Sequence, residues 1–388
     1  MNKNFHRWQR KAGFLILALL SLPGYTGEQS DSTFLFSDRV ENPAIQKAMH
    51  SVLEAVATAK QDPERPVYHF RPPANWMNDP NGTIFYKGYY HVFYQHNPYG
   101  DQWGHMHWGH TRSMDLVYWE HLPIALAPSL DQGEDHCFSG CAWVNPKDEL
   151  MLFYTSVSAR ENARPHEQWA ALPLDDELIN WEKHEGNPIL TLKTHGGPEL
   201  GGSWRDPFLV EEQGRTFMVI GADTEDRAVI PIYEARNAEL TEWDYRGILY
   251  SLPKSDLQFF ECPNFFKLDE KWVLFTSPYR PVEYFVGDFN IETCQFTPET
   301  RGVLDPGFGG TANYYATNIS MDDKGRCILY GWVRGFKEGR GWNGCLALPR
   351  VLTIASDGTP RQVPVQELKK LRGERYIAGV PEKKRVSD

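Results

Sequence analysis

The chain has 388 residues, 41% of them hydrophobic and 23% charged, a composition that excludes a largely disordered protein. Its 32 Gly and 27 Pro favour turns and short strands over long helices. The formal net charge of −11 argues against nucleic acid as a partner. An acidic chain with 13 Trp, 18 Tyr and 21 Phe better fits a neutral, hydroxyl-rich ligand such as a sugar.

Residues 1–27 have the pattern of a secretory signal peptide. No acid occurs before residue 28. Four basic residues precede an apolar run at 13–22: Lys3, Arg7, Arg10 and Lys11. The run is shorter than the roughly 20 residues of a membrane-spanning helix, although an uncleaved membrane anchor is the alternative interpretation. Cleavage would remove these four charges and leave a net charge of −15. We therefore expect a secreted or periplasmic protein that does not stay on the membrane.

The segment 28–65 contains one predicted amphipathic helix. Asn42-Pro43 is typical of an N-cap followed by proline at the first helical position. Apolar residues then recur with the helical period as far as about Lys60: Ile45, Ala48, Met49, Val52, Leu53, Val56 and Ala57. A proline-containing run at 61–66 ends the helix. Its apolar face is expected to pack on the main domain.

The six cysteines are expected to be buried free thiols: Cys137, Cys141, Cys262, Cys294, Cys327 and Cys345. The first two are four residues apart in a strand-like segment. This separation is about 13 Å in an extended chain, which is too long for a disulfide. The spacing of all six matches no zinc motif.

A β-rich unit occurs five times between residues 67 and 357. The clearest part of each unit is a run of strand-forming residues, at 89–95, 149–155, 215–221, 271–277 and 326–332. In three units a Trp-acid pair lies 28 to 32 residues after the run begins: Trp119-Glu120, Trp181-Glu182 and Trp243-Asp244. Repeats of this length are typical of propeller blades with four strands each. The sequence therefore predicts an all-β, five-bladed β-propeller over 66–373, followed by a polar tail at 374–388.

The repeats also align three carboxyl side chains. If the five runs are second strands, each innermost strand begins about ten residues earlier in the chain. Asp79, Asp206 and Glu261 occupy that position in three units, whereas the other two have Ser139 and Ala316, the latter beside a tyrosine. Because the innermost strands of a propeller surround one axis, the three carboxyls are expected to converge.

Three kinds of site contain converging carboxyls, and the spacing alone leaves all three open. A hard cation such as calcium binds carboxylate oxygens. Acids before proline also occur in structural turns. A glycosidase uses one carboxylic acid to protonate the leaving oxygen and a second carboxylate to attack the sugar or to activate water. The neighbouring aromatic, amide and guanidinium groups favour the glycosidase: Trp76, Asn78, Gln95, Trp103 and Arg205.

Three histidines raise the alternative of a metal site. In an extended segment the side chains of His105 and His107 point to one face and that of His110 to the other. The Trp and Gly residues around them favour packing instead. We therefore expect neither a metal nor another cofactor.

Together these motifs resemble those of glycoside hydrolase family 32, the invertase and fructanase group. The resemblance runs from about residue 67 to residue 367. It rests on residues 76–82 (WMNDPNG), 93–98 (FYQHNP), 108–110 (WGH), 138–140 (FSG), 205–207 (RDP) and 261–262 (EC). Cys141 stands where the family usually has Ser. The family has the five-bladed propeller that the repeats predict.

The resemblance implies a role for each carboxyl in the retaining, two-step hydrolysis of a β-fructofuranosidic bond in sucrose or a fructan. Asp79 would be the nucleophile, Asp206 would stabilise the oxocarbenium-like transition state, and Glu261 would be the general acid/base. The implied substrate contacts are Trp76, Asn78, Gln95, Trp103, Phe138, Ser139 and Arg205. No cofactor or metal is implied.

Two alternatives stay open beside hydrolysis. The same carboxylates serve transfer of the fructosyl group to another sugar, so only the acceptor side of the site decides between the two reactions. A non-catalytic fructan-binding propeller is the other alternative, although such a protein would be expected to have lost one of the acids. Sucrose, inulin and levan all remain candidate substrates.

The chain departs from the family pattern near its C-terminus. Family members usually carry a C-terminal β-sandwich, whereas here only a short polar segment follows the expected end of the propeller. Two interpretations stay open: the protein lacks the sandwich, or the chain is truncated. The helix predicted within 28–65 is expected to cover part of the apolar surface that this leaves exposed.

Overall fold

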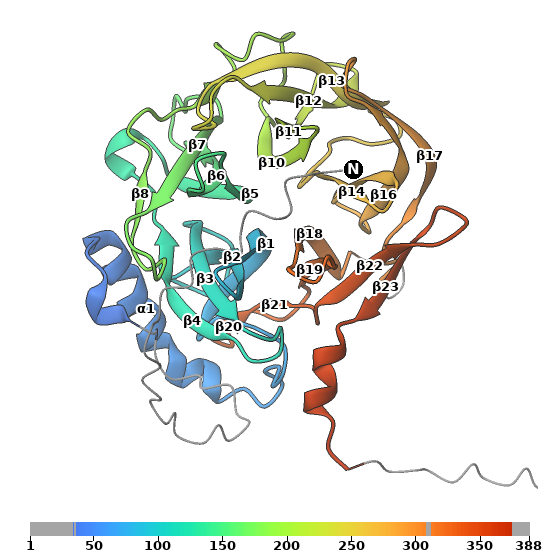
Figure 1. Cartoon of the computed structure of the whole chain (residues 1–388). Coiled ribbons are helices and arrows are strands. Elements are labelled where there is room, and N and C mark those ends of the chain that lie inside the picture. Colours follow the sequence, from blue (N-terminus) through green and yellow to red (C-terminus); the bar gives the residue numbers. More distant parts are fainter. Residues whose placement is uncertain (1–33, 35, 308–311, 375–388) are drawn as a thin grey trace, which may run out of the picture.

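The computed structural model describes residues 34, 36–307 and 312–374. Within these residues five β-sheets surround a central axis, which confirms the predicted all-β, five-bladed propeller (Figure 1). The strands extend from residue 75 to residue 364 and so lie within the predicted range of 66–373. The predicted signal segment, and the predicted tail after residue 374, lie outside the described residues.

Each blade is a mainly antiparallel sheet whose strands follow one another outward from the axis. Blade 1 consists of β1 (Asn75–Tyr86), β2 (Tyr89–Asn97), β3 (His107–Ser113) and β4 (Glu120–Leu126). Blade 2 consists of β5 (His136–Val144), β6 (Leu150–Val157), β7 (Glu167–Pro173), β8 (Trp181–Lys183) and β9 (Leu190–Thr191). Blade 3 consists of β10 (Arg205–Glu212), β11 (Arg215–Asp223), β12 (Arg227–Ala235) and β13 (Trp243–Pro253).

The last two blades follow the same order. Blade 4 consists of β14 (Asn264–Leu268), β15 (Lys271–Thr276), β16 (Glu283–Asn290) and β17 (Gln295–Val303). Blade 5 consists of β18 (Tyr314–Met321), β19 (Cys327–Val333), β22 (Arg350–Ile354) and β23 (Pro360–Pro364), with β21 (Cys345–Leu346) paired to β19. Short 3-10 helices lie outside the blades: η1 (Ser37–Arg39), η2 (Leu130–Gln132) and η4 (Gln366–Leu371).

The five repeated runs of the sequence are the second strands of the blades, as predicted. They form β2, β6, β11, β15 and β19, and every residue of β6 is buried. A second strand has neighbouring strands on both sides and neighbouring blades on both faces, so it appears in the sequence as a continuous apolar run. The Trp-acid pairs lie at the start of the fourth strands β4, β8 and β13.

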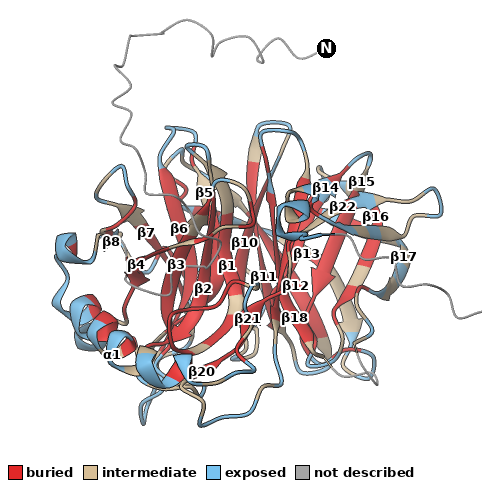
Figure 2. Cartoon of the chain, turned by 90° about the horizontal axis from the view of Figure 1, so that it is seen from below, coloured by how far each residue is buried: buried red, intermediate tan, exposed pale blue. Residues whose placement is uncertain are grey.

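The helix α1 (Pro43–Lys60) has the bounds that the sequence predicts. The Asn42 side chain accepts hydrogen bonds from the backbone N–H groups of Ala44 and Ile45, at 2.9 and 3.4 Å. A cap of this kind stabilises a helix by about 1 kcal/mol. α1 lies beside blade 1, with one side exposed and the other buried (Figures 1 and 2). Among the described residues, no helix is both long and apolar enough to span a membrane.

The buried face of α1 packs on the propeller. Ile45, Met49 and Val52 share a core cluster with Ile124 of β4 and with Trp342. Two residues of the predicted apolar face, Leu53 and Ala57, are instead exposed, and Ala59 is buried. The buried set follows a narrow stripe spaced by three, four and seven residues, and Leu53 lies about 100° round the helix from Val52.

A short strand, β20 (Trp342–Asn343), closes the ring between blades 5 and 1. It runs parallel to the start of β1, so that residues 342 and 343 are paired with residues 75 and 76. Asp62, just after α1, accepts a hydrogen bond from the Trp342 indole at 2.9 Å and forms an ion pair with Arg340 at 3.2 Å. The segment that follows α1 therefore holds β20 in place against the start of β1, next to the motif that contains Asp79.

The cysteine prediction is confirmed. All six cysteines are buried and free.

We predict that Ile45→Ala lowers the free energy of unfolding by about 2–4 kcal/mol, because a buried side chain is replaced by a cavity between α1 and blade 1. Leu53→Ala is the matched control. This side chain is 41% exposed on the same helix, so its removal should change stability by less than about 0.5 kcal/mol. Urea unfolding of the two variants measures both values, and equal losses would contradict the packing described for α1.

Candidate active site

The structure brings the three predicted carboxyls into one cavity. Asp79, Asp206 and Glu261 line a cavity of about 450 Å³ to which all five blades contribute. The other lining residues are Asn78, Gln95, Trp103, Phe138, Ser139, Arg205, Tyr279, Tyr315, Trp332 and Arg334. The cavity thus contains every residue expected from the sequence except Trp76.

Trp76 is half-buried next to the cavity and is not one of the residues that line it. Its indole N–H donates a hydrogen bond to the Asn78 side-chain oxygen at 2.7 Å, and its ring packs edge-on against Trp332 at 5.6 Å between centroids. Trp76 thus orients Asn78, whose amide in turn donates to Asp79. A direct contact between Trp76 and the substrate stays a prediction.

A β-bulge at the same point of the inner strands directs these side chains into the cavity. In four of the five inner strands, two residues lie opposite a single residue of the second strand, with regular pairs on either side. These residues are 78–79 in β1, 138–139 in β5, 206–207 in β10 and 316–317 in β18. Such bulges interrupt the usual alternation of side chains and re-aim them.

The bulges correct the expectation that the three acids are strictly equivalent. Asp79 is the second residue of its bulge and Asp206 is the first. Glu261 precedes β14, and its carbonyl accepts a hydrogen bond from the Ser277 N–H at 2.9 Å. This position corresponds to Arg205 and Tyr315, which form the last regular pairs before their bulges. Relative to the bulge, the three acids therefore occupy successive positions: Glu261 just before it, Asp206 first within it and Asp79 second. An alignment based on strand spacing alone cannot distinguish positions that differ by one or two residues.

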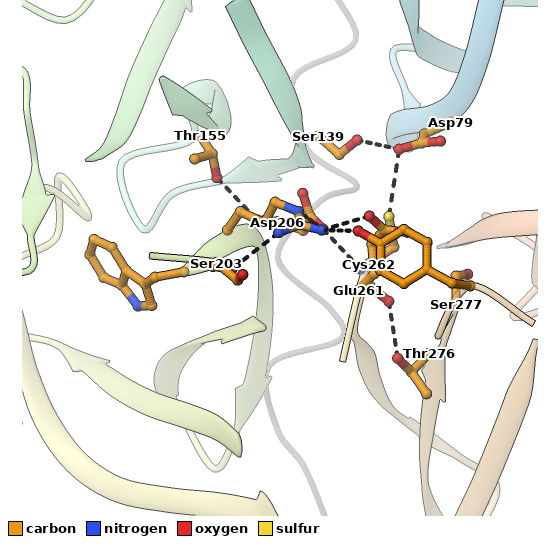
Figure 3. A network of polar contacts seen from close by, with 12 residues as sticks. Asp79, Ser139, Thr155, Ser203, Asp206, Glu261, Cys262, Thr276 and Ser277 are labelled. Atoms are coloured by element: carbon orange, nitrogen blue, oxygen red, sulfur yellow. Dashed lines mark hydrogen bonds and ion pairs between the residues drawn. The ribbon is translucent and has the colours of Figure 1, made fainter. Parts of the chain in front are cut away.

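Asp79 is held through both carboxylate oxygens, and Figure 3 shows the contacts of Oδ2 with Ser139 and Cys262. Ser139 donates to Oδ2 at 2.6 Å, Asn78 donates to Oδ1 at 2.9 Å, and the Cys262 thiol lies 3.6 Å from Oδ2. Burial raises the pKa of Asp79 and the Glu261 carboxylate adds to this effect, whereas the hydrogen bonds from Ser139 and Asn78 lower it. The donors thus fix the orientation of a carboxylate whose surroundings disfavour its charge.

Asp206 lies deeper and is 5% exposed. Its Oδ2 accepts a hydrogen bond from the Cys262 backbone N–H at 3.0 Å, and its own N–H donates to Thr155 at 3.0 Å (Figure 3). The backbone is left-handed at this residue, with φ 65°. Burial raises the pKa of Asp206 to about 7, with Arg205 opposing the shift and Glu261 reinforcing it.

Glu261 is held by two donors from neighbouring blades. Arg205 Nη2 donates to Oε1 at 2.7 Å, and the Tyr315 hydroxyl donates to Oε2 at 2.7 Å. Arg205 also lies 3.7 Å from Asp206 and packs over the Phe259 ring at 4.2 Å. Burial opposes its charge, but Asp206 and Glu261 keep the pKa of Arg205 above its usual value. Arg205 therefore offsets the repulsion between the carboxylates.

Several lining residues were not predicted from the sequence. Tyr315 was noted at the aligned position of blade 5 but was given no role, although the repeat alignment pointed to it. Tyr279 and Arg334 lie in loops outside the aligned runs. Trp332 is the last residue of the run in blade 5, and nothing in the sequence distinguishes it from the buried residues before it.

We predict that Asp206→Asn stabilises the folded protein by about 1–2 kcal/mol at pH 8. The pKa of Asp206 in the folded protein, about 7, lies above its ordinary value of 3.8. Above pH 7 the ionised carboxylate therefore costs folding free energy, and this cost disappears as the pH falls from 7 toward 4. The advantage of the variant should shrink over that range, as measured by urea unfolding at pH 5 and pH 8.

The exposed Asp244→Asn is the control and should show no such pH-dependent gain. An Asp206→Asn variant that is less stable than the parent at pH 8 would contradict the electrostatic account.

Comparison with known proteins agrees with this geometry. The sequence model described as the glycosyl hydrolases family 32 N-terminal domain matches residues 69–364. The sucrose-6-phosphate hydrolase of Zymomonas mobilis is 36% identical over 345 residues, which cover 81% of this chain and 64% of that protein. The levanase of Bacillus subtilis is 34% identical over 348 residues, which cover 80% of this chain and 48% of that protein.

A solved structure shows the same similarity. The Bombyx mori GH32 β-fructofuranosidase, a mutant in complex with sucrose, superposes with a TM-score of 0.75 and 31% identity, over 86% of this chain and 72% of that one. The chain thus spans less than two thirds of the Zymomonas relative and somewhat more of the Bombyx protein. With a family match over most of its length, the chain belongs to glycosyl hydrolases family 32.

Proposed function

We propose that the protein hydrolyses β-fructofuranosidic bonds in sucrose or a fructan by a retaining double displacement. One observation carries this proposal: Asp79 and Glu261 face the same cavity, and each is oriented by its own set of hydrogen-bond donors. A pair of carboxyls with separate environments is what a retaining glycosidase needs, since one must attack and the other must protonate.

In the first step Asp79 Oδ attacks the anomeric carbon of the terminal fructosyl unit. The bond between that carbon and the glycosidic oxygen breaks, and the protonated Glu261 gives its proton to the departing oxygen. Ser139 and Asn78 hold the Asp79 carboxylate in position for attack. Arg205 and Tyr315 stabilise the Glu261 carboxylate that is left behind.

In the second step Glu261 takes a proton from water, whose oxygen attacks the anomeric carbon. The ester bond to Asp79 breaks and free fructose leaves. Asp206 would accept hydrogen bonds from sugar hydroxyls, and these bonds would strengthen as positive charge develops on the ring. Because Asp206 is fixed by the Cys262 N–H, it needs no rearrangement to do so.

The names of similar proteins support the substrate class. They include a sucrose-6-phosphate hydrolase, a levanase and a β-fructofuranosidase in complex with sucrose. The fructan 1-exohydrolase IIa of Cichorium intybus, in complex with 1-kestose, also superposes, with a TM-score of 0.71 and 29% identity over 79% of this chain and 62% of that one. These sugars share a fructosyl unit, which we propose occupies the deep part of the cavity.

We predict that the protein releases fructose from sucrose, inulin or levan, and that Asp79→Asn lowers kcat by at least about a thousandfold because the nucleophile is lost. Asn keeps the shape of the side chain, so the variant should remain folded. Asp244→Asn, an exposed acid outside the cavity, is the activity control.

The products separate the alternatives. Equal amounts of glucose and free fructose from sucrose indicate hydrolysis, whereas an excess of glucose indicates fructosyl transfer. Initial release of the β-anomer of fructose, observed by NMR, indicates retention. Equal activity of the Asp79→Asn variant and the parent, or a folded parent that cleaves none of the three sugars, would rule out the proposed reaction.

A further inference from the structure

Tyr279 is a large aromatic side chain that is exposed at the mouth of the cavity. It lies in the loop between β15 and β16 of blade 4, it lines the cavity, and it is 65% exposed. A broad aromatic surface open to water beside a polar cavity is characteristic of a ligand-binding surface. The mechanism above gives this residue no role.

The backbone holds Tyr279 in an unusual conformation. Its φ is 59°, in the left-handed region that bulky residues rarely adopt. Its N–H donates to the Tyr315 hydroxyl at 2.8 Å, and the next residue, Arg280, is anchored to Glu283 at 2.6 Å. Conformations of this kind persist where the surroundings fix them, and they concentrate at functional sites.

Tyr279 contacts both donors that hold the proposed acid/base. Its hydroxyl accepts a hydrogen bond from Arg205 Nη2 at 2.6 Å, and the same nitrogen donates to Glu261 at 2.7 Å. Tyr315, which accepts the Tyr279 N–H, donates to the other Glu261 oxygen. The Tyr279 ring is therefore fixed beside Glu261.

The position of Glu261 locates the leaving group. In the proposed mechanism Glu261 gives its proton to the glycosidic oxygen, so the sugar attached to that oxygen must lie next to Glu261, toward the open side of the cavity. That side presents the Tyr279 ring together with Arg334, whose guanidinium lies over the rings of Tyr315 and Trp332 at 5.3 and 5.0 Å. A ring surface and a hydrogen-bond donor are what a hydroxyl-rich sugar can stack on and bind.

We propose that Tyr279 is the specificity-determining residue for the leaving group, with its ring as the surface on which the sugar beyond the scissile bond stacks. This inference rests on the proposed function for the direction of the leaving group. The fructosyl unit occupies the deep part formed by the bulges, and Tyr279 contacts only the sugar attached to it. Tyr279 thereby selects among β-fructosides that differ in the leaving group.

The test compares sucrose, which carries a leaving group, with fructose, which does not. Calorimetry on the Asp79→Asn background measures the Kd of each sugar, so that sucrose stays intact. Adding Tyr279→Ala should weaken sucrose binding about tenfold and change fructose binding less than about twofold, because only the leaving-group contact is lost. Tyr279→Phe keeps the ring and should bind sucrose within about threefold of the background. Tyr68→Ala removes another exposed tyrosine, one that does not line the cavity, and is the matched control.

The outcomes separate this inference from the proposed function. Retained fructose binding shows that a Tyr279 variant is folded, so selective loss of sucrose binding supports the proposal. Equal losses for both sugars, or no loss for either, overturn it. In active protein, Tyr279→Ala should also change the ratio of kcat/KM between sucrose and inulin, whereas Tyr279→Phe should preserve it. If the parent cleaves no sugar, the proposed function fails, while the binding comparison still decides the role of Tyr279.

Discussion

The repulsion among three carboxyls in one cavity is the constraint on which the rest of the site depends. Burial raises the pKa of Asp79 and of Asp206, and Glu261 adds to both shifts. Arg205 lies between Asp206 and Glu261, contacts both, and supplies the compensating charge. Partly buried charges of this kind are tolerated only where pairing and hydrogen bonds are complete, so the loops around them must be held firmly. The donors to the acids accordingly come from all five blades.

The propeller meets this constraint because each acid is on a different blade. The relative position of the carboxyls is then set by packing between blades, and closure of the ring matters as much as any single strand. Here β20 and the segment after α1 hold blade 1 against blade 5, close to the motif of Asp79. The bulges place polar side chains where regular strands would direct alternate residues away from the axis.

The cavity has two parts with different structural origins. Its deep part comes from the bulged inner strands and contains the acids. Its open side comes partly from loops between second and third strands, which contribute Trp103 in blade 1 and Tyr279 in blade 4. Loops vary at little cost to a scaffold of packed strands, so the open side of such a cavity can change while the deep part that contains the acids is retained.

The sequence alone determined the features that follow from local periodicity. The helical period and the Asn42 cap gave α1 its bounds, apolar runs marked the second strands, and their spacing led to Asp79, Asp206 and Glu261. The tertiary structure decided where side chains point. It turned the Trp76 indole toward Asn78, put the three acids at successive positions around the bulge, and brought Tyr279 beside Glu261. Bulges and contacts between blades set these directions. Both depend on residues that are far apart in the chain, so neither produces a periodic pattern in the sequence.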